Sequence, residues 1–193
     1  MTEQEILDLF YDSGALLKGH FKLSSGRHSD VYFEKFTLLR KPPYVEKLCR
    51  ELADRFADDG VELVVGPTTG GVLVAYETAK NLGTDSIYAE ASGDGAGRIF
   101  KRGFSIDPGT KTLIVDDIMT TGGSVREVID LCRQYRADIV GLGLLLDRSG
   151  GDVTFDYPLK ALATVAAGSW APEECPLCRK DIPLTQRGSR KFG

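Results

Sequence analysis

Near its middle the chain reads Leu113-Ile114-Val115-Asp116-Asp117-Ile118-Met119-Thr120-Thr121-Gly122-Gly123-Ser124. The three leading apolar residues are typical of the end of a buried parallel strand, and the two carboxylates are expected where that strand meets solvent. Small, hydroxyl-bearing residues follow, and the apolar spacing after Ser124 predicts an amphipathic helix. Such a loop suits a phosphate dianion, because free backbone N–H groups and the helix dipole face it.

The two carboxylates indicate what is attached to that phosphate. They would repel the phosphate itself, whereas the vicinal hydroxyls of a ribose donate hydrogen bonds to carboxylates, and Mg²⁺ would moderate the charge. An acidic pair after a strand is common in α/β proteins, and a Thr-Gly turn alone can be a simple helix cap. Both features in one unbroken stretch favour a site for a phosphorylated ribose.

This stretch resembles the phosphoribosyl pyrophosphate (PRPP) signature of type I phosphoribosyltransferases. Further segments are similar to the orotate phosphoribosyltransferases, in that family's order, over about residues 5 to 155. They are the N-terminal base-binding segment, the pyrophosphate loop and an Arg after a later strand, here residues 14–29, Gly66-Pro67-Thr68-Thr69-Gly70-Gly71 and Leu146-Asp147-Arg148. The resemblance implies Mg²⁺-dependent transfer of the phosphoribosyl group from PRPP to orotate, giving orotidine 5′-monophosphate and pyrophosphate in pyrimidine biosynthesis.

The resemblance also assigns the PRPP-binding residues. They would be Thr68, Thr69, Gly70, Gly71, Arg98, Asp116, Asp117, Ile118, Met119, Thr120, Thr121, Gly122, Gly123 and Ser124. Mg²⁺ would arrive with PRPP near the acidic pair, with no direct protein ligand. A non-proline cis peptide is implied in the pyrophosphate loop, at Thr68–Thr69.

Catalysis and base recognition are assigned in the same way. The catalytic residues would be Asp116, Asp117, Lys101 and Arg102. The orotate site would comprise Thr120, Arg148 and Ser25, with Arg27 and His28 as weaker candidates. Arg148 offers a planar fork for the carboxylate that distinguishes orotate from purine bases, although an ordinary ion pair with Asp147 is the alternative.

The expected mobile loop departs from the family pattern. Residues 89–103 are rich in glycine, their cations are Arg98, Lys101 and Arg102, and they include no histidine. Gly70 also stands where a lysine is often found. Either the three cations compensate, or turnover is slow, or the reaction differs. The alternatives are a phosphoribosyltransferase for a purine or another base, and a PRPP-sensing regulator without catalysis.

Composition limits the class of protein. The 193 residues carry 24 basic and 28 acidic side chains, a net charge of −4, without a block of like charge, so we expect neither nucleic-acid nor membrane binding. The N-terminus lacks the features of a signal peptide, and four cysteines then predict reduced thiols and a cytoplasmic location. The family resemblance implies a homodimer.

Alternating strand and helix patterns predict an α/β fold with a mostly parallel twisted sheet flanked by helices. The strand exits at 66–71, 116–124 and 147–151 would then share one edge. We expect a single domain over 1–193, with a core of about 42–150. The resemblance implies a small hood built from about 1–41 and 151–193, which completes the type I phosphoribosyltransferase fold.

The tail contains the single pair Cys175-Pro176-Leu177-Cys178. A tetrahedral zinc site usually needs two such pairs, so zinc is feasible mainly if two subunits each supply one. Cys49 and Cys132 fall at apolar helix positions and are interpreted as core residues. The basic residues of 187–191 form either a solvated tail or an approach to a phosphate site.

Overall fold

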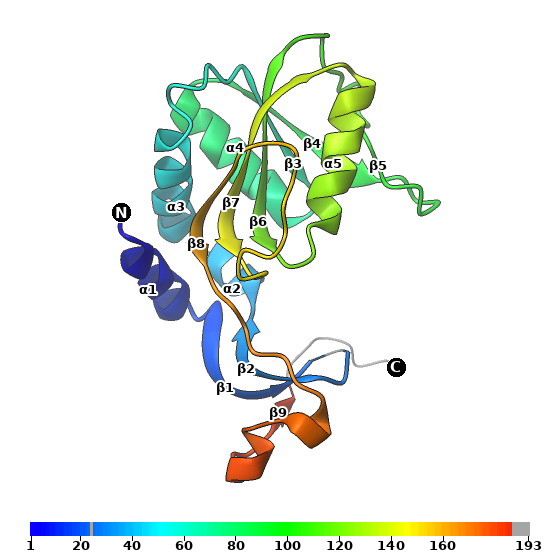
Figure 1. The fold of residues 1–193 in the computed structure, drawn as a ribbon. Helices are drawn as coiled ribbons and strands as arrows, with labels where there is room; N and C mark the ends of the chain where they lie inside the picture. The colour runs from blue at the N-terminus through cyan, green and yellow to red at the C-terminus, as the bar shows by residue number, and fades with distance from the viewer. Residues whose placement is uncertain (24, 187–193) are drawn as a thin grey trace.

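The structure is a computed structural model and describes residues 1–23 and 25–186. The basic segment 187–191 lies outside the described residues, so its role stays a prediction. Figure 1 shows a large sheet between helices and a smaller sheet that extends away from one end of it. No helix among the described residues is long and apolar enough to cross a membrane.

The large sheet is mostly parallel, as the alternating pattern predicts. Its six strands lie in the order β5-β4-β3-β6-β7-β8. Their bounds are Leu63–Pro67 (β3), Asp85–Ala91 (β4), Arg98–Ile99 (β5), Lys111–Met119 (β6), Asp138–Asp147 (β7) and Leu159–Thr164 (β8). Only the short β5 runs antiparallel, against β4, in the glycine-rich segment after that strand. The carboxyl ends of the parallel strands therefore meet at one edge.

The helices cover both faces of this sheet. They are α1 (Glu3–Ser13), α2 (Lys35–Leu39), α3 (Pro42–Asp54), α4 (Gly70–Leu82) and α5 (Gly123–Gln134). The first helix begins at a capping box of Thr2 and Glu5, and the third begins at the proline pair Pro42-Pro43. Helices α1, α3 and α4 pack on one face, and α5 packs on the other (Figure 1).

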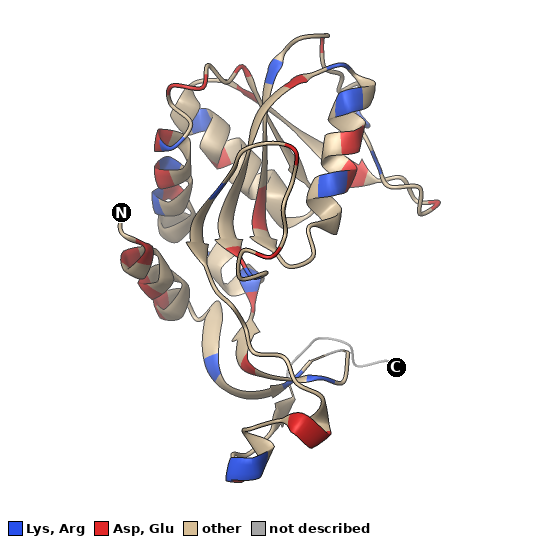
Figure 2. Ribbon diagram, viewed as in Figure 1, with Lys and Arg blue, Asp and Glu red and all other residues tan. Residues whose placement is uncertain are grey.

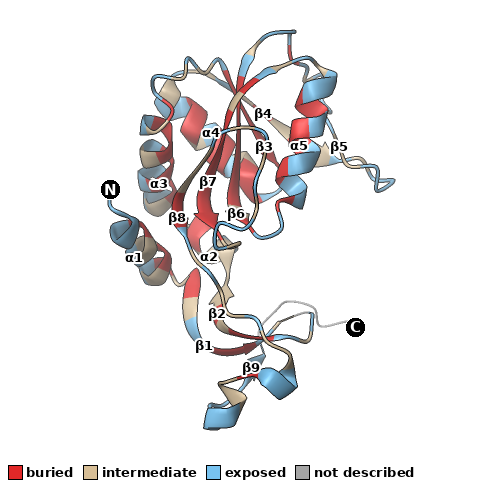
Figure 3. Cartoon of the chain, viewed as in Figure 1, coloured by how far each residue is buried: buried red, intermediate tan, exposed pale blue. Residues whose placement is uncertain are grey.

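Alternating side chains of the strands divide the core into two layers. Val64 and Val115 face α3 and α4, whereas Val65 and Ile114 face α5. This period of two is what a strand buried on both faces requires. Figure 3 shows the central strands β3, β6 and β7 as almost continuously buried, with helices exposed on their outer sides. Cys49 and Cys132 are buried in these two layers, as predicted, and burial raises the pKa of each thiol to about 12.

The small sheet has the order β2-β1-β9, with bounds Leu16–Lys22 (β1), His28–Phe33 (β2) and Thr185–Gln186 (β9). β1 and β2 form an antiparallel pair, and β9 lies parallel to β1. Two short 3₁₀ helices precede β9, at Pro172–Glu174 (η1) and Cys178–Lys180 (η2). The C-terminal part of the hood is expected to begin at about residue 151, but β8 pairs with β7 and therefore belongs to the large sheet. The division into core and hood stays a prediction, with β8 moved from the hood to the core.

Candidate active site

Three loops meet at the carboxyl edge of the large sheet. β6 lies between β3 and β7 and is parallel to both, so the segments that follow these three strands are neighbours. They are the β3–α4 loop, the β6–α5 loop and the segment after Asp147. The predicted convergence of these strand exits is therefore confirmed by the strand order. Ligands of open α/β sheets bind at such an edge.

The acidic pair lies inside β6, not where the strand meets solvent as expected. Pairing with β7 continues to Met119, opposite Asp147, and encloses both carboxylates. Asp116 is 7% exposed and Asp117 is 1% exposed. Burial, and then the neighbouring Asp117 charge, raise the pKa of Asp116 to about 7. Figure 2 shows that the strands of the large sheet carry few charged residues.

A lysine from outside the large sheet neutralises one of these charges. Lys35, at the start of α2, places Nζ 3.0 Å from Oδ2 and 3.2 Å from Oδ1 of Asp117. Asp117 Oδ1 also accepts a hydrogen bond of 2.6 Å from the backbone N–H of Ile118. Sequence reasoning missed this lysine, because it lies 82 residues away along the chain and belongs to no motif.

The β3–α4 loop packs directly on the acidic pair. The Thr68–Thr69 peptide is cis, as the resemblance implied. A Cβ atom on Gly70 would lie 1.7 Å from Asp117 Oδ2, and one on Gly71 would lie 2.6 Å from Cδ of Pro67. Any side chain at position 70 would therefore displace the loop or the carboxylate. The packing of this loop on Asp117 thus requires glycine at position 70.

The β6–α5 loop forms a small polar hollow in front of a helix N-terminus. A cavity of about 150 Å³ is lined by Asp116 and residues 118–125. Thr120, Thr121, Gly123 and Ser124 are exposed, whereas Ile118 is partly and Met119 almost fully buried. Gly122 has φ 77°, which lets the chain turn into α5. The N–H groups of the first turn of α5 are left for a ligand or water.

Arg98 connects the two loops. Its Nη1 lies 3.3 Å from Oγ1 of Thr68 and its Nη2 lies 3.4 Å from Oγ of Ser124. The Nε of Arg98 also pairs with Glu127 on α5, at 3.1 Å. Arg98 is thus the one cation of the glycine-rich segment that, within the part of the chain the structure describes, contacts both predicted phosphate-binding loops.

Lys101 and Arg102 lie further out and share a partner. Lys101 Nζ is 3.8 Å from Oε2 of Glu90, and Arg102 Nε is 3.3 Å from Oε1 of the same carboxylate. Arg102 also lines a cavity of about 460 Å³ whose wall includes Thr68, Thr69 and Gly70. Arg102 therefore borders the β3–α4 loop, whereas Lys101 contacts β4 at Ala91 and Glu90, and the charges of both predicted catalytic cations are paired.

Arg148 follows β7 and lies against an aromatic ring. Its guanidinium carbon is 4.3 Å from the centre of the Phe33 ring, at the end of β2. The Oδ1 of Asp147 accepts from the N–H of Ser149, and the structure has no ion pair to Arg148 among the described residues. Burial lowers the pKa of Arg148 from its ordinary value. The ion-pair alternative with Asp147 is therefore wrong.

The base-site residues predicted in the N-terminal segment are not brought to Arg148, whereas Thr120 follows Met119, whose carbonyl accepts from the N–H of Arg148. Ser25 lies exposed in the turn between β1 and β2, where its Oγ faces the N–H of Arg27. This turn is at the end of β2 away from Phe33, and the strand alone rises about 16 Å between them. Arg27 donates to Ser169, and His28 points into a different cluster. The role of Ser25 stays a prediction.

Comparison with known proteins gives a consistent family. The phosphoribosyl transferase domain family matches residues 38–173. A curated orotate phosphoribosyltransferase from Pelotomaculum thermopropionicum is 48% identical over 192 residues, which covers 100% of both chains. One from Chlorobium phaeobacteroides is 44% identical over 190 residues and covers 98% of this chain and 97% of that one.

Solved structures share the fold. A crystal structure of orotate phosphoribosyltransferase from Aeropyrum pernix superposes with a TM-score of 0.68 at 27% identity, covering 83% of this chain and 93% of that chain. A crystal structure of adenine phosphoribosyltransferase from Thermoanaerobacter pseudethanolicus gives 0.61 at 17% identity, covering 70% and 88%. The second likeness shows that the same fold serves proteins named for different bases.

Proposed function

The chain belongs to the phosphoribosyl transferase family, and from that premise we propose that it transfers the phosphoribosyl group of PRPP to orotate. The products are orotidine 5′-monophosphate and pyrophosphate, as in pyrimidine biosynthesis. Full-length relatives at 40% to 48% identity carry the name orotate phosphoribosyltransferase, which supports orotate over other bases.

The observation that carries the base assignment is Arg148. Its guanidinium lies on the Phe33 ring at the same sheet edge as the phosphate-binding loops, and no carboxylate pairs with it within the described residues. A flat base that bears a carboxylate would supply that missing partner, and a bidentate pair with a guanidinium is strong. A purine has no carboxylate to offer, so Arg148 favours orotate. Thr120, exposed on the neighbouring loop, would complete this side of the base site.

PRPP would lie along the three loops. The 5′-phosphate would occupy the hollow of residues 118–125 at the start of α5, where backbone N–H groups and hydroxyls are free. The ribose hydroxyls would donate to Asp116 and Asp117. The pyrophosphate would lie along residues 68–71, where Arg98 adds a positive charge that already contacts Thr68. We assign the catalytic role of the family to the acidic pair on this basis.

The acidic pair also fits Mg²⁺. Carboxylate oxygens are ligands that this cation prefers, and Asp116 lines the hollow in front of α5. The raised pKa of Asp116 reflects the same excess of buried negative charge, which a nearby cation would relieve. When bound with PRPP, Mg²⁺ would neutralise charge on the pyrophosphate.

The reaction breaks a C–O bond at the anomeric carbon of the ribose and makes a C–N bond to the base. Its transition state resembles an oxocarbenium ion, so the residues act by positioning both reactants, stabilising the departing charge and excluding water. Asp116 and Asp117 fix the ribose, Arg148 fixes the base, and Arg98 faces the leaving group. Lys101 and Arg102 would approach it only after leaving Glu90, so they stay proposed catalytic residues.

The protein is proposed to be a homodimer that uses the face of α2 and α4. Phe36, Leu73 and Tyr76 are 50%, 48% and 67% exposed, and they line two adjoining hollows, one of which reaches Arg102. A contiguous apolar surface of this kind is typical of an interface. A second copy seated there would also close the side of the β3–α4 loop.

The dimer proposal is tested by sedimentation of the wild type, Tyr76→Glu and the exposed control Lys47→Glu. Dimeric wild type and Lys47→Glu with a monomeric Tyr76→Glu would support it. A dimeric Tyr76→Glu, or a monomeric wild type, would exclude this face.

The function is tested by following the ultraviolet absorbance of orotate with PRPP and Mg²⁺. Loss of absorbance that requires both additions, with no turnover of adenine or hypoxanthine, is the expected result. Measurable PRPP binding without turnover of any base would instead support the PRPP-sensing regulator.

A further inference from the structure

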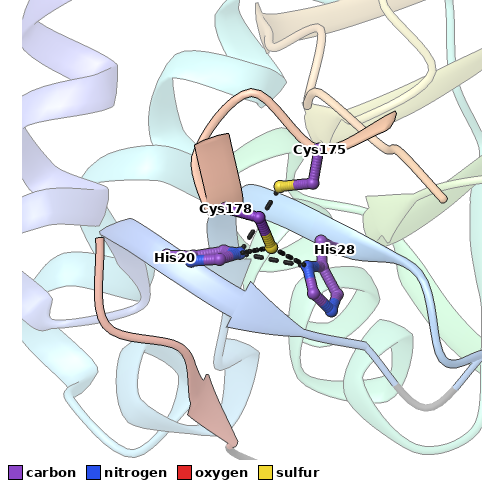
Figure 4. A group of neighbouring side chains, drawn as sticks. All are labelled: His20, His28, Cys175 and Cys178. Atoms are coloured by element: carbon purple, nitrogen blue, oxygen red, sulfur yellow. Dashed lines mark hydrogen bonds between the residues drawn. The ribbon is translucent and has the colours of Figure 1, made fainter. Parts of the chain in front are cut away.

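Four side chains of metal-ligand type converge in the small sheet, away from the proposed active site. Figure 4 shows His20 on β1, His28 at the start of β2, and Cys175 and Cys178 from the segment of the two 3₁₀ helices. One ligand atom from each residue lies within 4.8 Å of all the others. The chain contains only two histidines, and both are in this cluster.

The distances between these atoms match a tetrahedral metal site. His20 Nε2 lies 3.1 Å from His28 Nδ1 and 3.4 Å from Cys175 Sγ. Cys178 Sγ lies 3.7 Å from His20 Nε2 and 3.3 Å from His28 Nδ1. Zinc bonds of about 2.3 Å to sulfur and about 2.05 Å to nitrogen place tetrahedral ligands about 3.3–3.8 Å apart. The four measured edges lie in or next to this range.

The surroundings hold the histidines as a metal requires. Nδ1 of His20 lies 2.7 Å from the carbonyl oxygen of Ile182 and donates to it, which leaves the lone pair of Nε2 directed into the cluster. Such an outer hydrogen bond to a carbonyl is typical of a metal-binding histidine. The backbone of His28 is fixed by two hydrogen bonds with Trp170, of 2.8 and 2.9 Å.

Burial makes this cluster of polar side chains energetically unfavourable when no metal ion is bound. His20, His28 and Cys175 are 2%, 5% and 0% exposed, and they lie where the tail packs on a sheet whose third strand has two residues. The buried aliphatic side chains that would stabilise this end of the sheet are few, and small units of this kind commonly depend on a metal. The thiols are free, so no disulfide already joins the tail to itself.

We propose that His20, His28, Cys175 and Cys178 bind one Zn²⁺ ion that fastens the C-terminal tail to the β1–β2 hairpin. Two sulfur and two nitrogen ligands in a tetrahedron favour zinc over Mg²⁺ or Ca²⁺. Both thiols would lose their protons to solvent when the ion binds. From the sequence, zinc is feasible mainly if two subunits each supply a Cys pair. The proposed site needs no second subunit, because one chain supplies all four ligands. All four positions are taken, so the ion would be structural.

The test is the metal content of the untagged full-length protein, expressed with zinc and freed of loose metal by gel filtration. Elemental analysis is expected to give one zinc per chain. Replacement by Co²⁺ is expected to give the visible d–d bands of a tetrahedral site and a thiolate charge-transfer band. Zinc-free protein that takes up neither metal after reduction, or that contains a Cys175–Cys178 disulfide instead, would overturn the proposal.

Variants locate the ion. Cys178→Ser and His28→Ala should each lose the zinc or the tetrahedral cobalt spectrum, whereas Cys132→Ala, at a buried thiol of α5, should keep both. Retention of zinc by Cys178→Ser and His28→Ala would exclude these ligands. X-ray absorption spectroscopy of the zinc-loaded wild type does not depend on how the variants fold. Two sulfur and two nitrogen neighbours around the zinc would support the proposed ligands, and any other set would contradict them.

Discussion

The ammonium nitrogen of Lys35 lies 3.0 Å from Oδ2 of Asp117, a residue that is only 1% exposed. Lys35 lies two residues after β2 of the small sheet, and Asp117 lies in β6, one of the two middle strands of the large sheet. Phe33, also at the end of β2, contacts Arg148 from β7. Both predicted substrate sites therefore depend on how the small sheet meets the large one.

Lys35→Met is expected to impair the use of PRPP. The change leaves a buried carboxylate without its counter-charge, and a hydrogen bond to a charged group contributes about 1.5–3 kcal/mol, so kcat/KM for PRPP should fall about 10- to 100-fold. Steady-state kinetics at saturating orotate measure this. Lys47→Met, on the exposed side of α3, is the matched control. Equal kinetics of the two variants would remove Lys35 from the site.

Arg148→Ala is expected to affect the two substrates unequally. Loss of the guanidinium removes the partner of the orotate carboxylate, so the KM for orotate should rise about 100-fold while the KM for PRPP changes little. Arg148→Lys should recover only part of the loss, since an ammonium lacks the planar fork. A parallel rise in both KM values would show that Arg148 supports the fold and does not read the base.

Asp116 should make the ligand-free protein less stable as pH rises. Its pKa is raised to about 7, so the folded protein holds a proton that the unfolded chain releases between about pH 4 and pH 7. The free energy of unfolding should therefore decrease across that interval. Asp116→Asn should remove this part of the decrease and be about 1–3 kcal/mol more stable than wild type at pH 8. Urea unfolding at pH 5 and pH 8 measures the difference, and a wild type that gains stability relative to Asp116→Asn between these values would contradict it.

Gly70→Ala is expected to destabilise the protein and to abolish most activity. The new Cβ would lie 1.7 Å from Oδ2 of Asp117, and overpacking of this kind costs about 1–3 kcal/mol or more. Thermal unfolding gives the loss of stability. Gly123→Ala is the control for stability, because a Cβ there meets only Oγ1 of Thr121, at 3.8 Å. Unfolding temperatures that match in both variants would mean that the β3–α4 loop can shift freely.

The sequence predicted the parts of the site that lie in continuous stretches. The PRPP signature, the β3–α4 loop and Arg148 each follow a parallel strand, and parallel strands bring their carboxyl ends together. The same reasoning predicted the mostly parallel large sheet. The sequence pattern predicted the acidic pair at the solvent-exposed end of the strand, because the apolar run ends at Val115. In the structure, pairing with β7 extends the strand to Met119.

Contacts between distant segments could not be predicted in this way. Lys35 and Phe33 meet Asp117 and Arg148 through the docking of the two sheets, and no local pattern encodes such a docking. His20 and His28 were separated from the Cys pair by more than a hundred residues. One signal was available: a chain with two histidines and one CxxC has the exact ligands for a single tetrahedral site.

The small sheet is assembled from the two ends of the chain, and this has a consequence for synthesis on the ribosome. β1 pairs with β9, and His20 meets Cys178 across 158 residues, so these contacts form only after the strands of the large sheet have been synthesised. The large sheet is finished with β8 and can fold before them. The hairpin that delivers Phe33 and Lys35 therefore gains its contacts with Cys178 and β9 later than the sheet whose substrate sites it completes.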